Sequence, residues 1–197
     1  MKLYIFIEVI EHTMNILKLN MKKNKNIVEI AQLGNPILRQ KAHKVKGFSL
    51  PQITKVVEDM LNTLSESNGV GLAAPQISES FCIVVIASKP SKRYPLAPEM
   101  SPVVMLNPSF QTMSEATVKD WEGCLSIPGI RALVPRYKNI KISYLDQIGE
   151  PHELLADGFI SRVFQHEYDH LNGLVYLDRV EDNKDIISES EFQKLMG

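Results

Sequence analysis

The chain has 197 residues and a mass of 22.3 kDa, a size that suggests one domain able to bury a core without a disulfide scaffold. Hydrophobic residues make up 44% and charged residues 23% of the sequence, which argues against disorder of the whole chain. The 22 basic and 23 acidic residues give a formal net charge of −1, so the chain has no global electrostatic reason to bind nucleic acid.

The first 26 residues are predicted to be an extension that is poorly ordered or results from a wrongly assigned start. Residues 1–10 are apolar, but they are too few to span a bilayer and they lack a small-residue cleavage site. The absence of Arg and Ser from residues 1–26 argues against an organelle transit peptide. A docked strand or a weak membrane contact stays open as the alternative.

The remaining sequence favours an α+β fold, because two clear helical patterns stand among several short strands. Apolar residues recur at helical spacing over residues 53–64, with Ser49 as the expected N-cap and residues 68–69 as the end. A second helix is expected over residues 159–171, with Asp157 as its cap. The predicted strands cover residues 81–87, 103–106, 138–145 and 152–155.

The second predicted helix contains the sequence His166-Glu167-Tyr168-Asp169-His170. Residues four apart lie on one helix face, so the imidazoles of His166 and His170 can point at one divalent metal ion. Glu167 follows the first of them and can act as general base on a metal-bound water. The alternative is a surface helix rich in His and acidic residues, and Asp169 is expected to be an exposed acid or a helix-surface partner.

Cys124 is the best candidate for a third ligand of such an ion. Its thiolate would complete a Cys-His-His site with an open fourth position for water. A small buried hydrophobic residue is an equally good interpretation of a free cysteine taken alone.

We expect short antiparallel strands around a central helix that carries the metal motif, plus a helix nearer the N-terminus.

The segment 69–76, Gly-Val-Gly-Leu-Ala-Ala-Pro-Gln, is a third candidate for function. Its two glycines allow the backbone to approach a ligand closely, and Gln76 offers an amide donor beside them. No Lys-Ser or Lys-Thr follows, which argues against a phosphate-binding loop.

Three segments, 69–76, 122–126 and 165–171, resemble the motifs of the peptide deformylase family and stand in the family's order. Residues 127–136 are also similar, and the resemblance covers roughly residues 27–180. It implies a single catalytic metallohydrolase domain over residues 27–180, which leaves residues 181–197 as a C-terminal tail.

The resemblance implies a hydrolase that removes the formyl group from the N-terminal formyl-methionine of newly made polypeptides and releases formate. It also implies one divalent metal ion, held by Cys124, His166 and His170. Fe(II) is the metal expected in the family, and Zn, Ni or Co can replace it.

The resemblance further assigns catalytic roles. Metal-bound hydroxide would attack the formyl carbon, with Glu167 as general base and then general acid. The Gln76 amide and the backbone N–H of Leu125 would stabilise the charge on the formyl oxygen. Gly71, in the same loop as Gln76, is placed with these catalytic residues.

The substrate pocket is expected to include Val70, Phe159 and Val163, around the methionine side chain. Plain core packing is the alternative for each of them. Arg131 matches a family arginine near the peptide backbone, and a surface salt bridge is the alternative. Trp121 could line the substrate groove or be a half-buried packing residue.

Arg162, residues 88–100 and the C-terminal tail depart from the family's pattern. Arg162 stands where an apolar residue is expected, so its side chain should either extend outward or narrow and polarise the pocket. Residues 88–100 form a long loop that could move over the cleft. The short acidic tail lacks the long basic helix of some relatives, so contact with the ribosome, if it occurs, is expected to be transient.

Two other classes of function stay open. A metallopeptidase would need a downstream ligand such as Glu181 or Glu189, and it leaves the Cys124 motif unexplained. A non-catalytic metal-binding paralogue would be expected to lack Glu167 or Gln76, and both are present.

The expected location is the cytoplasm, because one possible cysteine pair, Cys82 with Cys124, is no disulfide framework and favours a reducing compartment. The expected partners are formyl-methionyl peptides. Neither a specific nucleic acid nor a membrane is expected as a partner.

Overall fold

The computed structural model describes residues 26–48, 50–91, 94 and 96–196. The predicted N-terminal extension therefore lies, apart from Asn26, outside the described residues. Within the described ranges, no helix is both long and apolar enough to cross a membrane.

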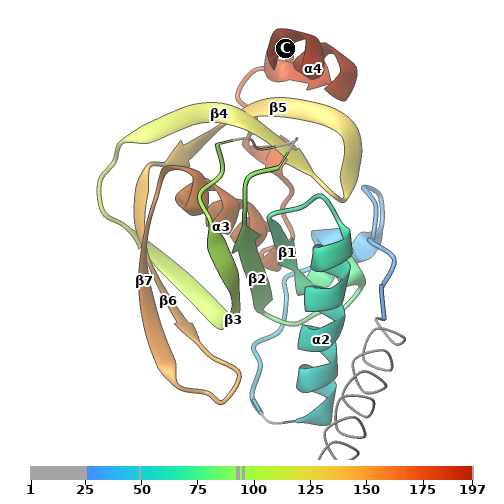
Figure 1. Cartoon of the computed structure of the whole chain (residues 1–197), viewed down its shortest axis with the longest axis vertical. Coiled ribbons are helices and arrows are strands. Elements are labelled where there is room, and N and C mark those ends of the chain that lie inside the picture. The colour runs from blue at the N-terminus through green and yellow to red at the C-terminus, as the bar shows by residue number, and fades with distance from the viewer. Residues whose placement is uncertain (1–25, 49, 92–93, 95, 197) are drawn as a thin grey trace, which may run out of the picture.

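The described chain forms two antiparallel sheets with α-helices packed against them (Figure 1). The strands are β1 (Gly71–Ala73), β2 (Ile83–Ser88), β3 (Met100–Thr112), β4 (Thr117–Cys124), β5 (Ile127–Tyr137), β6 (Asn139–Leu145), β7 (Pro151–Asp157) and β8 (Ile186–Ser188). The helices are α2 (Pro51–Glu66), α3 (Gly158–Leu171) and α4 (Glu189–Met196), with 3₁₀ segments η1 (Pro36–Arg39), η2 (Ala74–Ile77), η3 (Tyr176–Arg179) and η4 (Asn183–Asp185). One sheet has the order β1-β2-β3-β6-β7 and the other the order β4-β5-β8. The predicted mixture of helices and antiparallel strands is confirmed.

Helix α2 forms where the apolar spacing predicts it. Its apolar face is buried together with Leu72, Val85 and Leu106 of the larger sheet. Leu50 occupies the N-cap position without a side-chain hydrogen bond, and Pro51 begins the helix. The expected cap, Ser49, lies outside the described residues.

Strand β3 is longer than the predicted strand over residues 103–106, because it continues through Asn107 and Pro108. Asn107 adopts a φ of 50°, and the pairing register shifts between Leu106 and Ser109. The strand therefore bends past a proline that cannot donate to the ladder. Its first part pairs with β2 and its last part with β6.

Helix α3 contacts strands of both sheets, including β1, β2, β5 and β7. Val163, Phe164 and Leu171 pack into a core cluster formed with the larger sheet. Asp157 occupies the predicted cap position, although its side chain makes no capping hydrogen bond. The other side of α3 faces the β4–β5 hairpin, and the polar residues on that side are buried there.

The C-terminal residues add a third strand to the smaller sheet and a helix beside it. Strand β8 pairs with β5, in a register that places Ser188 opposite Ile130. Helix α4 follows at once and lies beside β5 at one end of the molecule (Figure 1). Residues 181–197 were expected only as a C-terminal tail, and no pattern in the sequence predicts β8.

Substitution of Asn107 is expected to destabilise the fold measurably. The Asn107 side chain accepts a hydrogen bond from Val45 N (2.8 Å) and donates one to Val45 O (2.9 Å). Asn107→Ala should lower the free energy of unfolding by about 3 kcal/mol, because it removes both bonds and places a Cβ at positive φ. Asn107→Gly tolerates that φ and should cost about 1 kcal/mol less. Urea unfolding measures both, and equal stability of Asn107→Ala and the parent would contradict this account of the bend.

Candidate metal centre and active site

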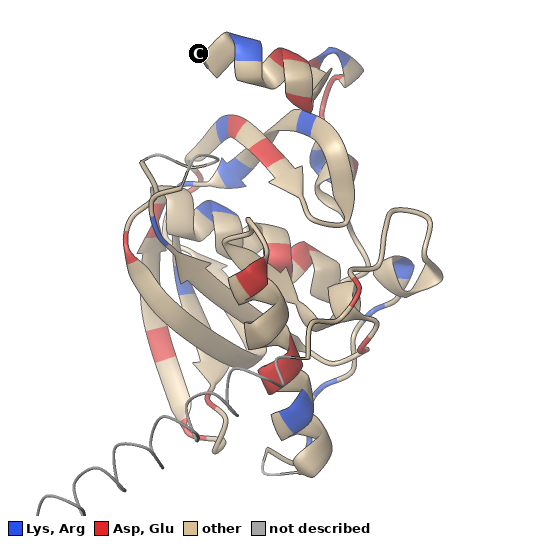
Figure 2. Ribbon diagram, turned by 45° about the vertical axis from the view of Figure 1, so that its right-hand side comes forward, with Lys and Arg blue, Asp and Glu red and all other residues tan. Residues whose placement is uncertain are grey.

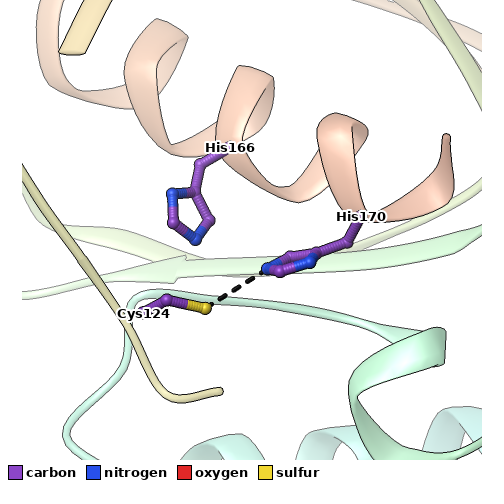
Figure 3. Close-up of side chains that lie close together, drawn as sticks. All are labelled: Cys124, His166 and His170. Atoms are coloured by element: carbon purple, nitrogen blue, oxygen red, sulfur yellow. Dashed lines mark hydrogen bonds between the residues drawn. The ribbon is translucent and has the colours of Figure 1, made fainter. Parts of the chain in front are cut away.

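Three buried side chains, from β4 and α3, converge on one point. Cys124 ends β4, and His166 and His170 lie one turn apart on α3 (Figure 3). The Sγ atom of Cys124 lies 3.3 Å from Nε2 of His170. The candidate ligand atoms of all three residues lie within 4.8 Å of one another.

The chemistry of this donor set fits a divalent metal ion. Burial alone would raise the pKa of the Cys124 thiol, but His170 and His166 lower this pKa well below its ordinary value. The thiolate is the form that ligates metals. One thiolate with two imidazoles suits Zn and other transition metals, and three protein ligands leave a coordination position open.

Glu122 fixes the orientation of His166. Its Oε2 lies 2.8 Å from Nδ1 of His166, so that nitrogen donates and the other ring nitrogen is left for a metal. Burial alone would raise the pKa of the Glu122 carboxyl, but hydrogen bonds from His166 and Arg136 hold it well below its usual range. Glu122 was not among the residues predicted to form the site. Its position two residues before Cys124 on one face of a strand was the available signal.

A buried network of ion pairs extends from Glu122. Arg136 donates from Nε and Nη2 to the two Glu122 oxygens, and its Nη1 donates to Asp169 at 2.6 Å. Arg179 also pairs with Asp169. The expectation that Asp169 is an exposed acid is therefore wrong. The Asp169 side chain points from α3 toward Arg136 of β5 and Arg179 of η3, and these two positive charges compensate for the burial of its negative charge.

Of the two expectations for Arg162, the outward extension is wrong, because its side chain is buried. Its Nη1 donates to Glu122 Oε1 (2.8 Å) and to Val134 O (2.7 Å), and its Nη2 donates to Val118 O (2.6 Å). The guanidinium thus ties α3 to β4 and β5. Arg162 still lines the pocket described below.

Glu167 is buried beside β1 and lines the pocket. Its Oε2 has no hydrogen-bond partner within the described part of the chain. Burial raises the pKa of its carboxyl to about 7, against the opposing charges of the two histidines. Gly71 makes the room for it, because a Cβ at that position would lie 2.5 Å from Glu167 Oε1. A side chain at position 71 would therefore displace the carboxylate.

Gln76 is held against the Cys124 side of the site. Its Oε1 accepts a hydrogen bond from Ala73 N at 2.8 Å. Its Nε2 donates to Ser126 Oγ at 3.2 Å and lies 3.5 Å from Cys124 Sγ. The amide donor therefore points toward the sulfur and into the same pocket that Leu125 lines.

A pocket opens beside the three candidate ligands. It is lined by four of the residues expected to contact substrate: Val70, Trp121, Phe159 and Val163. Arg131 is not among the lining residues. Its guanidinium is buried and forms hydrogen bonds of 2.6 and 3.1 Å with the carboxylate of Glu189.

Comparison with known proteins places these features in one family. The family model described as polypeptide deformylase matches residues 27–185. Peptide deformylase 2 of Nostoc sp. (strain PCC 7120) is 45% identical over 173 residues, which cover 88% of this chain and 97% of the relative. Peptide deformylase 1 of Nitrosomonas europaea is 42% identical and covers 79% of this chain and 89% of its own length.

Solved structures give the same result. A class I type b peptide deformylase from Acinetobacter baumannii, bound to Met-Ala-Ser, matches with a TM-score of 0.77 and 38% identity, over 80% of this chain and 100% of that one. A peptide deformylase from Synechococcus elongatus, in complex with actinonin, matches with a TM-score of 0.72 and 35% identity, over 82% of each chain. The chain belongs to the polypeptide deformylase family.

Proposed function

We propose that this chain is a peptide deformylase, which removes the formyl group from the N-terminal formyl-methionine of newly made polypeptides and releases formate. The observation that carries the proposal is the convergence of Cys124, His166 and His170 beside a pocket that Glu167 and Gln76 also line. Family membership and 45% identity to a relative named as a peptide deformylase support it.

The proposed metal ligands are Cys124, His166 and His170, so α3 acts as the central helix that carries the His-Glu-x-x-His metal motif. When bound, a divalent ion supplies Lewis-acid chemistry: it polarises a carbonyl oxygen and lowers the pKa of a coordinated water. We propose Fe(II) as the native metal, with Zn, Ni or Co able to replace it. The mixed thiolate and imidazole donor set supports this range.

Glu167 is the proposed proton carrier of the reaction. Water adds to the formyl carbon, and the proton that it loses goes to the Glu167 carboxylate. The C–N bond then breaks, and Glu167 returns the proton to the leaving amine, which gives formate and a free methionine amine. The position of Glu167 supports both roles, because its carboxyl lines the pocket and its Oε2 has no hydrogen-bond partner among the described residues, which leaves that oxygen available to accept and return a proton.

The proposed oxyanion donors are Gln76 Nε2 and the backbone N–H of Leu125. Both residues line the pocket, and the hydrogen bond from Ala73 N holds the Gln76 amide in one orientation. Gly71 belongs to the catalytic set because its missing side chain leaves space for the Glu167 carboxylate.

The pocket formed by Val70, Trp121, Phe159 and Val163 is proposed to take the methionine side chain. Its apolar walls match an unbranched apolar side chain. Arg131 was expected near the peptide backbone. Its guanidinium is held by Glu189, the first residue of α4. We therefore propose that Arg131 affects peptide binding indirectly, by holding α4 in place.

Residues 27–180 are the proposed catalytic domain, and the cytoplasm, where newly made polypeptides emerge, is the proposed location. Contact with the ribosome is proposed to be transient. A metallopeptidase and a non-catalytic metal-binding paralogue remain the alternatives that the next experiment separates.

Glu167→Gln should lower kcat for a formyl-Met tripeptide by about 10²–10⁴-fold, because it removes the group that carries the proton. Its metal content and melting temperature should stay close to those of the parent. The measurement is formate release by protein purified and assayed without oxygen. A variant that keeps more than a tenth of the parent's kcat would contradict the role. A metal-loaded parent that cleaves only unformylated peptides is a metallopeptidase, and one that cleaves neither supports the non-catalytic alternative.

Cys124→Ala should abolish stoichiometric metal binding, because two imidazoles alone make an incomplete site. In the parent, addition of Zn²⁺, Ni²⁺ or Fe²⁺ should raise the melting temperature, since an ion that binds only the folded state stabilises it. Metal analysis and thermal unfolding of both proteins, with and without a chelator, give the result independently of activity. Cys82→Ala is the matched control and should bind metal normally. Equal metal content in both variants would rule out Cys124 as a ligand.

A further inference from the structure

The C-terminal segment is built into the wall of the candidate site, although it lies beyond the residues that the family model matches. The family match ends at residue 185, and β8 and α4 follow it. The pairing of Ser188 with Ile130 brings Glu189, the first residue of α4, beside the start of β5. Figure 2 shows acidic and basic positions along this helix, outside the core of the molecule.

Two contacts hold α4 in place. Glu189 accepts two hydrogen bonds from Arg131, whose side chain is only 1% exposed. Phe192 packs its ring under the Arg131 guanidinium (4.7 Å) and edge-on against Trp121 (5.5 Å between ring centroids). A bidentate ion pair combined with aromatic contacts fixes the helix on β4 and β5. Trp121 in turn lines the pocket proposed for the methionine side chain.

A second groove of about 540 Å³ runs between α4 and the beginning of β5. It shares Cys124 and Leu125 with the pocket beside the candidate ligands, so the two spaces meet at the reacting centre. Glu189 and Gln193 of α4 line it on one side and Ile130 on the other. This volume is within the range of cavities that hold small ligands.

We propose that α4 forms one wall of the binding groove for the peptide chain that follows the first residue of the substrate. This inference rests on the proposed function. The groove begins where the substrate would react. Cys124 and Leu125 line both spaces, so a peptide whose formyl end lies beside these two residues can continue from them into the groove. Gln193 donates its Nε2 to Glu189 at 2.8 Å, which turns its amide oxygen into an oriented acceptor for a peptide N–H. The role of Arg131 is to anchor this wall.

The test compares two substrates, formyl-Met amide and formyl-Met-Ala-Ser, on the full-length metal-loaded protein. Glu189→Gln and Gln193→Ala should each raise KM for the tripeptide at least about threefold, the effect of one lost hydrogen bond. The KM for formyl-Met amide should rise less than the KM for the tripeptide, because only the tripeptide reaches the groove beside α4. Glu191→Gln is the matched control: the same helix and the same substitution, at an exposed carboxylate paired with Lys194. A merely structural role for α4 would not make the effect depend on peptide length.

An unchanged KM in both variants, or a KM that rises equally for the two substrates, would overturn the proposal. Gln193 is exposed and is not part of the Arg131–Glu189 ion pair that fixes the helix. Gln193→Ala therefore keeps the test valid if Glu189→Gln does not fold. Calorimetric binding of unformylated Met-Ala-Ser to the parent and Gln193→Ala separates the two proposals. A parent without formate release refutes the function, whereas equal affinity of parent and variant for Met-Ala-Ser refutes the groove.

Discussion

The buried carboxylate of Glu122 joins the β4–β5 hairpin to α3, and the geometry of the candidate metal centre depends on this contact. It accepts hydrogen bonds from Arg136 and Arg162, and it holds Nδ1 of His166 at 2.8 Å. The strand that carries Glu122 ends at Cys124, so one short segment supplies both a candidate ligand and the group that orients another. Removing the carboxylate would free the imidazole to rotate and would deprive two buried arginines of their shared carboxylate partner, which costs several kcal/mol.

The rest of the site follows from placing α3 between the two sheets. On its apolar side, Phe164 and Leu171 pack on the larger sheet, and on its polar side Asp169 pairs with arginines of the smaller sheet and η3. This packing fixes the rotation of the helix, and the rotation brings Glu167 so close to β1 that only glycine fits at position 71. The low exposure of Glu167, its raised pKa and an oxygen with no hydrogen-bond partner among the described residues are consequences of the same packing.

Local patterns were sufficient to predict α2, α3 and the 138–155 hairpin, because each depends on the spacing of apolar residues and on nearby turn residues. The residues alone made Cys124 a candidate ligand and a buried hydrophobic residue equally well, and only the resemblance of three segments to one family decided between the two. Contacts between residues far apart in sequence could not be predicted, such as those of Trp121 with Phe192 and of Arg131 with Glu189. The same reason explains the error at Asp169: a charged residue is expected to be exposed until the partners that neutralise it are known.

The measurement that tests the central claim most directly is an anomalous-scattering map of crystals of the metal-loaded protein. The account predicts one ion about 2.0–2.4 Å from Cys124 Sγ and from one nitrogen of each histidine. It also predicts that Nδ1 of His166 stays hydrogen-bonded to Glu122 and that no fourth protein atom ligates the ion. An ion bound through Nδ1 of His166, a fourth protein ligand that closes the site, or an ion bound elsewhere would contradict the account.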